Sequence, residues 1–428
     1  MVMVSTRGKD SQKISDAILN GLASDGGLFI PSSFQKVDFT PYINNADKED
    51  AYGKIAKAML NSFFVDDEIW DKLDSIIHKA FDFPCPLKFM DDKKGAYLEL
   101  FCGPTAAFKD FGARFLACAM EAILQKRGGK LTVLVATSGD TGSAVAGAFY
   151  KKQGIKVKVL FPKGGISPRQ KKLLTVWGEN IESYEVDGTF DDCQRMVKEA
   201  FNNKEYREKY NLTSANSINI ARLLPQMTYY AYSSCLYKKV TGNEPIFIIP
   251  SGNVGNATAA YYAKTLGAPI KQIVLAQNAN RPMVDYLADG VYTPRTSVKT
   301  LANAMDVGAP SNAERMFALY PTFEEFSKNV SAYSVSDEQI IETIKDTYSK
   351  QNNIICPHTA CAKKVYDDYF KGENAIVVCT AHPAKFEKII YSALGINVEL
   401  PKALNDLLLQ KEIYKNIGND YREIFDGR

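Results

Sequence analysis

Two glycine-rich loops constrain this 428-residue chain more than any other feature. They are TSGDTGSA at 137–144 and PSGNVGNA at 250–257, and each follows an apolar run, LTVLVA at 131–136 or PIFIIP at 245–250. An amphipathic run follows each loop, so both loops are strand-to-helix junctions. Glycines let backbone N–H groups converge there, and the helix N-terminus adds about half a positive charge. Each junction is therefore a candidate anion site, although one such loop alone is as often only a tight connection.

Lys109, in the run GPTAAFKDFG at 103–112, is the third informative feature. Most lysines are solvated surface groups, because burying an ammonium is unfavourable. The small and apolar neighbours of Lys109 instead indicate a partly desolvated amine, whose pKa falls below about 10.4 and which can attack a carbonyl. Two anion sites and one such lysine predict a phosphorylated carbonyl cofactor that the lysine holds covalently, with pyridoxal phosphate as the leading hypothesis.

Composition excludes several classes of function. The chain is 46% hydrophobic and 24% charged, and its 52 Lys and Arg residues nearly balance 49 Asp and Glu residues without a basic block. Nucleic acid is therefore not an expected partner. No apolar stretch reaches the roughly 18–20 residues that span a bilayer, and no signal-peptide core is present. We expect a cytoplasmic protein of two or three domains that does not bind a membrane.

Metal sites and disulfides are not expected either. The eight cysteines lack C-x-x-C spacing, and the three histidines, His78, His358 and His382, do not form a helical metal pair. The sequence therefore favours a mechanism without a metal. His358 and His382 have two interpretations, as residues that line the site or as structural histidines.

The fold class follows from apolar runs that alternate with helical patterns from about residue 89 to 390. Such runs predict α/β lobes with mainly parallel twisted sheets covered by helices, and the site in the cleft between the lobes at the carboxyl ends of the strands. Ser336 to Gln339 reads as a capping box that begins a helix. Helical spacing near the start predicts a mainly helical N-terminal segment. The expected parts are an N-terminal domain at 1–88, a first lobe at 89–225, a second lobe at 226–390, with which the Lys109 segment can also pack, and a helical tail at 391–428.

Seven motifs, spread over nearly the whole length, carry a resemblance to a known family. They are STRG at 5–8, GLASDGGLFIP at 21–31, GPTAAFKDFG, ATSGDTGSA, NSINIARLLPQ at 216–226, PSGNVGN and TAHPAKF at 380–386. In these motifs and their order the chain resembles the threonine synthase family, of the tryptophan-synthase-β-like, fold type II class of pyridoxal phosphate enzymes. So many motifs in one order form a far more specific signal than one glycine loop.

The resemblance implies roles for individual residues. Lys109 would hold pyridoxal 5'-phosphate and would be the catalytic base. The residues implied for cofactor binding are Lys109, Asp140, Gly252, Asn253, Val254, Gly255, Asn256 and Thr380, with the glycine loop around the cofactor phosphate. The residues implied for the substrate carboxylate are Thr137, Ser138 and Thr141. Those implied for the leaving phosphate are Asn216, Ser217 and Arg222, together with Asn253.

Four positions keep two interpretations. Asp140 would face the cofactor's phenolic oxygen, but two anionic oxygens repel unless one carries a proton, so its contact stays open. Thr380 either lies near the pyridine nitrogen or caps the helix that follows. Arg222 either binds phosphate or forms an ion pair on a helix surface. Cys102 stands where the family commonly has His, which leaves the surroundings of the lysine open.

The implied reaction converts O-phospho-L-homoserine and water to L-threonine and phosphate. One alternative within the fold is a phospho-lyase that acts on phosphohomoserine or a similar phosphorylated amino acid and leaves a keto acid. A remote alternative is a relative that binds a ligand without turnover, against which the presence of Lys109 and the GNVGN loop speaks. A monomer and a homodimer are both compatible with the sequence.

Overall fold

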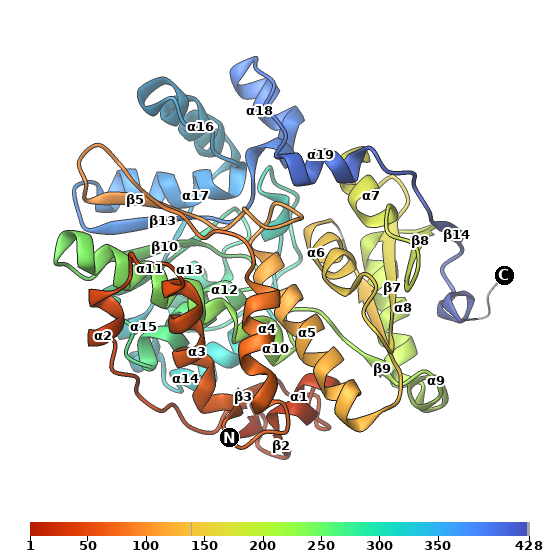
Figure 1. Ribbon diagram of the computed structural model, residues 1–428. Coiled ribbons are helices and arrows are strands. Elements are labelled where there is room, and N and C mark those ends of the chain that lie inside the picture. The colour runs from red at the N-terminus through yellow and green to blue at the C-terminus, as the bar shows by residue number, and fades with distance from the viewer. Residues whose placement is uncertain (138, 426–428) are drawn as a thin grey trace.

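Two helix-covered sheets form the two lobes of the protein (Figure 1), in a computed structural model that describes residues 1–137 and 139–425. The α/β class and the mainly parallel sheets expected from the sequence are confirmed. One sheet has six strands in the order β12-β11-β10-β13-β5-β4, and the other has five in the order β14-β8-β7-β6-β9. Every neighbouring pair in both sheets is parallel except β4 with β5.

The strands lie where the apolar runs of the sequence predicted most of them. The six-stranded sheet contains β4 (Leu87–Phe89), β5 (Gly95–Glu99), β10 (Ile246–Pro250), β11 (Gln272–Gln277), β12 (Ser331–Ser334) and β13 (Ala375–Cys379). The five-stranded sheet contains β6 (Leu131–Ala136), β7 (Ile155–Pro162), β8 (Ile181–Val186), β9 (Leu212–Thr213) and β14 (Lys415–Ile417). The short strands β4, β9, β12 and β14 were not expected, because two to four residues carry too little hydrophobic pattern to mark a strand.

Helices cover both faces of both sheets. Those of the five-stranded lobe and of its borders are α5 (Lys109–Arg127), α6 (Asp140–Phe149), α7 (Pro168–Thr175), α8 (Phe190–Asn202), α9 (Lys204–Lys209) and α10 (Ile220–Leu223). Those of the six-stranded lobe are α11 (Gln226–Thr241), α12 (Gly255–Thr265), α13 (Pro282–Asp289), α14 (Ala313–Leu319), α15 (Phe323–Asn329), α16 (Asp337–Gln351), α17 (Pro357–Val365) and α18 (Glu387–Leu394). The predicted capping box begins α16, since Ser336 accepts a hydrogen bond from the Gln339 N–H.

Alternate residues of each strand enter different hydrophobic cores. In β10, Ile246 and Ile248 pack with α16 and α17, whereas Phe247 and Ile249 enter the large core that contains α5, α11 and α12. The same large core takes one face of β6 and β7, while their other face packs under α8. One core therefore runs between the two sheets, as expected for sheets buried on both faces.

The N-terminal segment is helical as expected, with α1 (Ile14–Asn20), α2 (Thr40–Asn44), α3 (Ala51–Phe64) and α4 (Leu73–Ala80). It also contains a small antiparallel sheet that was not expected, formed by β1 (Val2–Ser5), β2 (Ser11–Lys13) and β3 (Phe29–Pro31). Strand pairing also departs from the expectation that the first lobe begins at residue 89. Strand β5 lies within the residues expected for the first lobe, but it pairs with β13 and so belongs to the six-stranded sheet.

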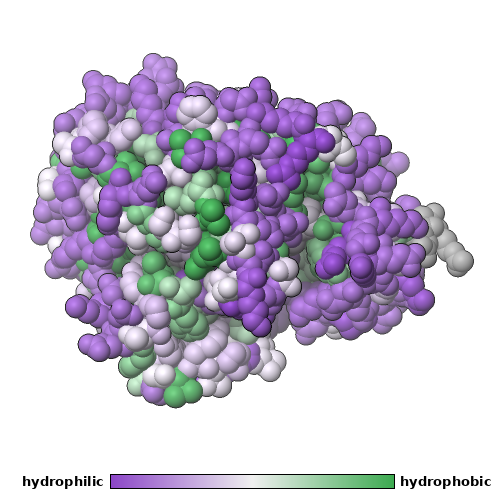
Figure 2. All heavy atoms as spheres, turned by 90° about the horizontal axis from the view of Figure 1, so that it is seen from below, coloured by the Kyte–Doolittle hydropathy of each residue, from purple (hydrophilic) through white to green (hydrophobic). Residues whose placement is uncertain are grey.

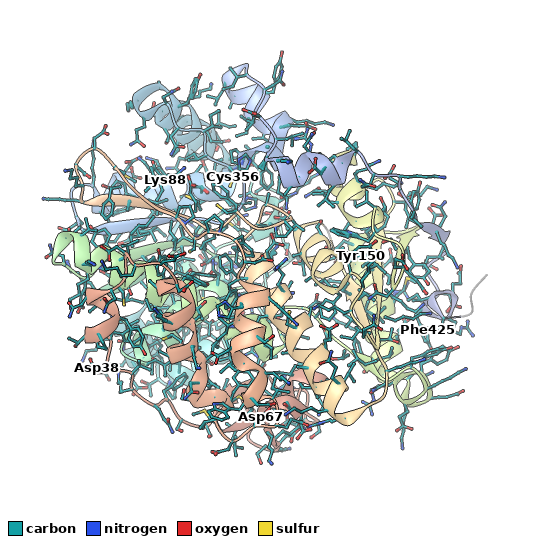
Figure 3. All side chains as sticks on the ribbon, in the orientation of Figure 1. Asp38, Asp67, Lys88, Tyr150, Cys356 and Phe425 are labelled. Carbon is teal, nitrogen blue, oxygen red and sulfur yellow. The ribbon has the colours of Figure 1, made fainter. Side chains whose placement is uncertain are left out.

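The C-terminal tail is only partly helical, which corrects the expectation for residues 391–428. Between α18 and α19 (Lys402–Leu408) the chain crosses from the six-stranded lobe to the other (Figure 1), where α19 packs on α7 and β14 pairs with β8. Phe425, labelled in Figure 3 at the edge of the molecule, stacks on Tyr210 with ring centroids 4.5 Å apart. Tertiary contacts with this edge, and not local pattern, make β14 a strand.

The face of the molecule seen in Figure 2 is mainly hydrophilic. On this face, apolar residues lie in smaller areas between polar ones. Within the described residues, no helix is both long and apolar enough to cross a membrane. Within the same residues, no group of three or more His, Cys, Asp or Glu side chains is arranged to hold a metal ion.

Two helical glycines give a matched test of the packing between α5 and α10. A Cβ added to Gly112 in α5 would lie 2.6 Å from the Arg222 carbonyl oxygen, whereas a Cβ added to Gly53 in α3 would meet nothing within 4 Å. We expect Gly112→Ala to lower the free energy of unfolding by about 1–3 kcal/mol through overpacking. We expect Gly53→Ala to raise it by about 0.5–1 kcal/mol, because alanine restricts the unfolded chain. Denaturant titration of both variants checks the opposite signs, and equal effects would contradict the close approach.

Candidate active site

One cavity of about 1180 Å³ gathers the site residues that the sequence predicted. It lies at the carboxyl ends of β6, β10 and β13, where Thr137, Ser251 and Thr380 follow the strands. Its lining includes Lys109, Thr137, Asp140, Thr141, Asn216, Ser217, Arg222, Gly252, Asn253, Val254, Gly255, Asn256 and Thr380. Ser138 lies outside the described residues. The roles assigned to these residues from the resemblance stay predictions, but their convergence in one cavity is a feature of the fold.

Lys109 is the first residue of α5 and is held by the loop before it. The Phe108 N–H donates to the Thr380 carbonyl oxygen at 2.8 Å, and residues 107 and 381 form an isolated β-bridge. Burial lowers the pKa of the Lys109 amine to about 8, with Asp140 opposing this shift and Lys385 and Arg222 adding to it. A substantial fraction of the amine is therefore neutral near physiological pH, which nucleophilic or base chemistry requires.

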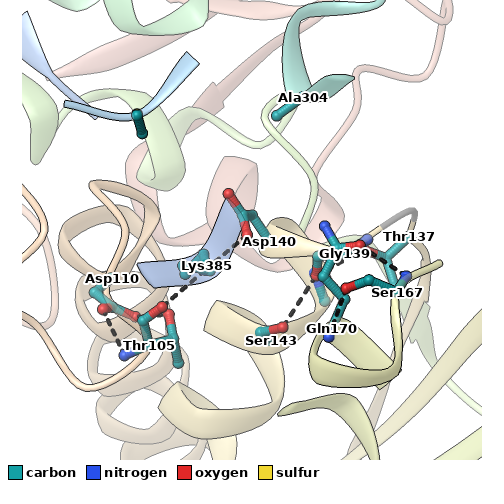
Figure 4. Close-up of polar contacts among 12 residues, drawn as sticks. Thr105, Asp110, Thr137, Gly139, Asp140, Ser143, Ser167, Gln170, Ala304 and Lys385 are labelled. Atoms are coloured by element: carbon teal, nitrogen blue, oxygen red, sulfur yellow. Dashed lines mark hydrogen bonds and ion pairs between the residues drawn. The ribbon is translucent and has the colours of Figure 1, made fainter. Parts of the chain in front are cut away.

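The loop before α6 is organised by Thr137. Its hydroxyl oxygen accepts a hydrogen bond from the Gly139 N–H at 3.0 Å (Figure 4). It also accepts one from the Gly142 N–H at 2.9 Å. Gly142 is required here, because a Cβ would lie 2.3 Å from the Thr137 methyl carbon. The Thr137 side chain therefore shapes the loop from within, and both Thr137 and Thr141 line the cavity.

The second glycine loop packs so closely against its neighbours that extra carbon atoms would not fit. A Cβ on Gly252 would lie 2.6 Å from the Met305 Cα, and a Cβ on Gly255 would lie 3.0 Å from the Asn312 side-chain nitrogen. Val254 between them has a φ of 59°, a left-handed conformation that β-branched residues rarely adopt. This strained turn directs successive N–H groups to the start of α12, as in other anion-binding loops.

Asn256 carries a buried donor at the second glycine loop that is unpaired among the described residues. Its side-chain oxygen accepts hydrogen bonds from both Tyr229 and Tyr230, the latter at 2.8 Å. Its Nδ2 is buried and has no hydrogen-bond partner among the described residues. An unpaired buried donor is unfavourable, so the amide is oriented for an acceptor supplied by a ligand. Together with the glycine loop, this donor fits the phosphate of pyridoxal phosphate.

Arg222 is buried, which rules out the interpretation as a helix-surface ion pair. Its side chain is 3% exposed, and one terminal nitrogen donates to the Ala215 carbonyl oxygen. Its Nε is buried with no partner among the described residues. Burial lowers the pKa of Arg222 to about 10, against the attraction of Asp110, so the guanidinium stays charged near neutrality. A buried cation with an unused donor that lines the cavity is suited to a second anion.

Asn253 and Ser217, two further candidates for phosphate binding, connect the second glycine loop with the segment at 216–226. Asn253 donates through its Nδ2 to the Ser217 hydroxyl at 2.6 Å, so the GNVGN loop and the NSINIAR segment are in contact. Arg315 supports both from behind, since it donates to the Ser217 carbonyl oxygen at 3.1 Å and to the Asn312 side chain at 2.7 Å. Arg315 is fully buried, and the sequence offered no signal for this role.

The structure decides which of His358, His382 and Thr380 line the cavity. His358 lines the cavity and accepts a hydrogen bond from the Ala304 N–H at 3.1 Å, whereas His382 caps the short helix η4 (Pro383–Phe386) and does not line the cavity. Because His382 is the cap, Thr380 is not, and Thr380 lines the cavity instead. Cys102 does not line the cavity.

The sequence interpretation missed Lys385, although the quoted TAHPAKF motif contains it. Lys385 Nζ lies 2.6 Å from Asp140 Oδ1, and both side chains are buried (Figure 4). Burial raises the pKa of Asp140, but Lys385 and then Lys109 lower it more, to about 2. Asp140 is therefore ionised and already paired. The positive charge of Lys385 offsets the repulsion between Asp140 and an anionic oxygen.

Comparisons with known proteins agree with this geometry. A pyridoxal-phosphate dependent enzyme model matches residues 93–381, and models of the threonine synthase N terminus and C-terminal region match residues 3–81 and 359–426. The threonine synthase of Haemophilus influenzae is 40% identical over 414 residues, which are 96% of this chain and 95% of the relative. That of Escherichia coli is 39% identical over 396 residues, 91% and 90% of the two chains. The chain belongs to the threonine synthase family.

Solved structures extend the similarity to three dimensions. The pyridoxal-phosphate-bound threonine synthase from Brucella melitensis superposes with a TM-score of 0.93 at 32% identity, covering 99% of this chain and 98% of that one. The yeast threonine synthase gives 0.90 at 32% identity, covering 100% and 97%. The cofactor of this family is pyridoxal 5'-phosphate, as the lysine and the two anion loops predicted.

The unpaired donor of Asn256 gives a direct prediction. We expect Asn256→Ala to weaken pyridoxal phosphate binding about 10- to 100-fold, the range for one hydrogen bond to a charged group. Cofactor titration followed by absorbance measures the effect. Asn180→Ala is the matched control, because the Asn180 amide donates to Phe149 and Ile155 carbonyl oxygens away from the cavity and should affect only stability. Equal cofactor affinity in both variants would remove Asn256 from the phosphate site.

Proposed function

We propose that this threonine synthase family member converts O-phospho-L-homoserine and water to L-threonine and phosphate at the cavity around Lys109. The observation that supports it is a desolvated, partly neutral lysine in one cavity with two residues that have unused donors, Asn256 at its Nδ2 and Arg222 at its Nε. A phosphorylated cofactor and a phosphorylated substrate account for both donors. Buried cations exceed buried carboxylates here, which favours ligands that bring several negative charges.

The chemistry divides between cofactor and chain. When bound, pyridoxal phosphate supplies the electron sink that makes the substrate's α-proton acidic. Lys109 is the base for that proton, because its pKa of about 8 leaves part of the amine free at neutral pH. The same amine is the proposed carrier for the β-proton and for the final return of a proton to the α-carbon. His358, whose pKa burial lowers to about 4, stays neutral and adds no competing acid.

The substrate phosphate carries negative charge as it leaves the γ-carbon, so a nearby cation stabilises it. Arg222 is the proposed partner, with Asn216, Ser217 and Asn253 as neutral donors on the same side of the cavity. The substrate carboxylate is assigned to the loop that contains Thr137, Ser138 and Thr141. Asp140, ionised and paired with Lys385, and Thr380 are assigned to the cofactor ring. A cytoplasmic location and a monomeric or homodimeric state stay predictions.

Arg222 provides the sharpest test of the phosphate assignment. We expect Arg222→Ala to lower kcat/KM for O-phospho-L-homoserine about 10- to 150-fold, since a charge-assisted contact contributes roughly 1.5–3 kcal/mol. Steady-state assays of phosphate and threonine give the value. A change within about twofold would contradict the assignment.

Product identity separates the proposed reaction from a phospho-lyase. Equal yields of phosphate and threonine are expected from the wild-type protein. Phosphate with a keto acid in place of threonine would select the lyase.

Exposed Arg195, which pairs with Glu199 on α8, is the control arginine for the Arg222 test, and its change to Ala should leave kcat/KM unchanged.

A further inference from the structure

The Asp140–Lys385 ion pair joins a predicted site residue to a buried lysine that the sequence analysis did not assign. The Lys385 side chain is 2% exposed and that of Asp140 is 6% exposed, and their charged atoms are 2.6 Å apart. Asp140 begins α6, and Lys385 lies in η4 just after β13, so the pair joins the two lobes. Asp140 lines the cavity, whereas Lys385 does not. Lys385 therefore acts on the cavity through its partner.

Lys385 is also fixed to the loop that carries the reactive lysine. Its Nζ donates to the Thr105 carbonyl oxygen at 2.8 Å, four residues before Lys109 (Figure 4). Asp110 holds the same loop from the other side, accepting from the Thr105 N–H at 2.9 Å and from its hydroxyl at 2.6 Å. The ammonium of Lys385 thus has a defined place between Asp140 and the Thr105 carbonyl.

Three charged groups act on Lys109 from the elements around it, and a fourth, titratable group lies in the same cavity. Asp140 on α6 favours the ammonium form of Lys109, whereas Lys385 on η4 and Arg222 on α10 disfavour it. His358 on α17 is neutral, because burial lowers its pKa to about 4. Among the described residues no ion pair involves Lys109, although a buried carboxylate is near enough to influence it.

A buried carboxylate next to a cavity lysine would ordinarily take that lysine as its counter-ion. Lys109 would then be held as an ammonium, which cannot attack a carbonyl or accept a proton. In this structure the carboxylate of Asp140 has a different cation, at 2.6 Å, and Lys109 is left without one.

We propose that Lys385 is a positioning residue that neutralises Asp140 and so keeps Lys109 available as a free amine for pyridoxal phosphate. This inference rests on the proposed function, in which Lys109 is the cofactor anchor. It assigns to the second lysine a role in the charge state of the first. The ion pair also lets an ionised Asp140 lie beside the cofactor without adding net negative charge.

The test measures how the full-length chain, freed of cofactor, takes up pyridoxal phosphate as a function of pH. The rate should rise with the fraction of neutral Lys109 amine and level off above about pH 8. In Lys385→Met the unpaired Asp140 should raise the midpoint by about one pH unit, so that uptake at pH 7 falls about tenfold. In Asp140→Asn the unpaired Lys385 should lower the midpoint by a similar amount.

Two further variants keep the test independent of folding. The double variant Asp140→Asn/Lys385→Met removes both charges and should bring the midpoint back to within a few tenths of a pH unit of wild type. Lys385→Arg keeps the cation and should shift the midpoint least among the single variants. Titration of pyridoxal phosphate itself is common to all proteins, so it cancels in the comparison.

Lys363→Met is the matched control for loss of a buried lysine. Lys363 is 4% exposed and pairs with Asp367 in the next element, η3 (Tyr366–Phe370), and it does not line the cavity. Its loss should lower thermal stability without moving the midpoint. A loss of stability alone therefore does not imitate the expected result.

The outcomes separate the inference from the proposed function. Opposite shifts in the two single variants, with recovery in the double variant, support the inference. Shifts of the same sign, or no shift while the visible absorption of the bound cofactor persists, overturn it. If Lys109→Ala keeps that absorption, the cofactor anchor itself is wrong, and the proposed function fails as well.

Discussion

Buried positive charge is the constraint on which this active site depends. Arg222, Arg315 and Lys385 are buried around one region, and Lys109 lines the cavity beside them. Among the described residues, Asp140 is the only carboxylate that forms an ion pair with any of these four side chains. Such an arrangement is unfavourable in an apolar core unless other groups replace water. Main-chain carbonyl oxygens do this for Arg315 and Lys385, while Arg222 keeps an unused donor. Phosphorylated ligands supply the negative charge that balances these cations, so the affinity of the site for anions and its stability have the same origin.

The topology explains why motifs far apart in sequence meet. Parallel strands present their carboxyl ends at one edge of each sheet, and the loop after β6 in one sheet lines the same cavity as the loops after β10 and β13 in the other. Strand β5 carries the chain out of the six-stranded sheet and into the turn before α5, which places Lys109 between the lobes. The tail then returns to the five-stranded sheet through β14. The chain thus crosses between the lobes more than once, and the site is built where it crosses.

Much of the fold was predictable, because long apolar runs carry enough pattern to mark buried strands. The runs at β6, β7, β8, β10, β11 and β13 are all strands, and the capping box at Ser336 begins α16. Strands β12 and β14 were missed because they are short edge strands with little burial. The lobe that β5 joins was also missed, since strand pairing over a long sequence separation leaves no local signal.

The sequence by itself determined the chemistry: an isolated lysine among small residues, two glycine loops that only close backbone approach explains, and motifs in family order. These are local features, set by which side chains a turn or helix start can accommodate. Only the tertiary structure decided the electrostatics. That Asp140 is paired with Lys385, that His382 and not Thr380 is the cap, and that Tyr229 and Tyr230 turn the Asn256 amide toward the cavity all depend on contacts between distant segments. Charge and hydrogen-bond partners are decided by distance in space, which the order of residues along a chain does not give.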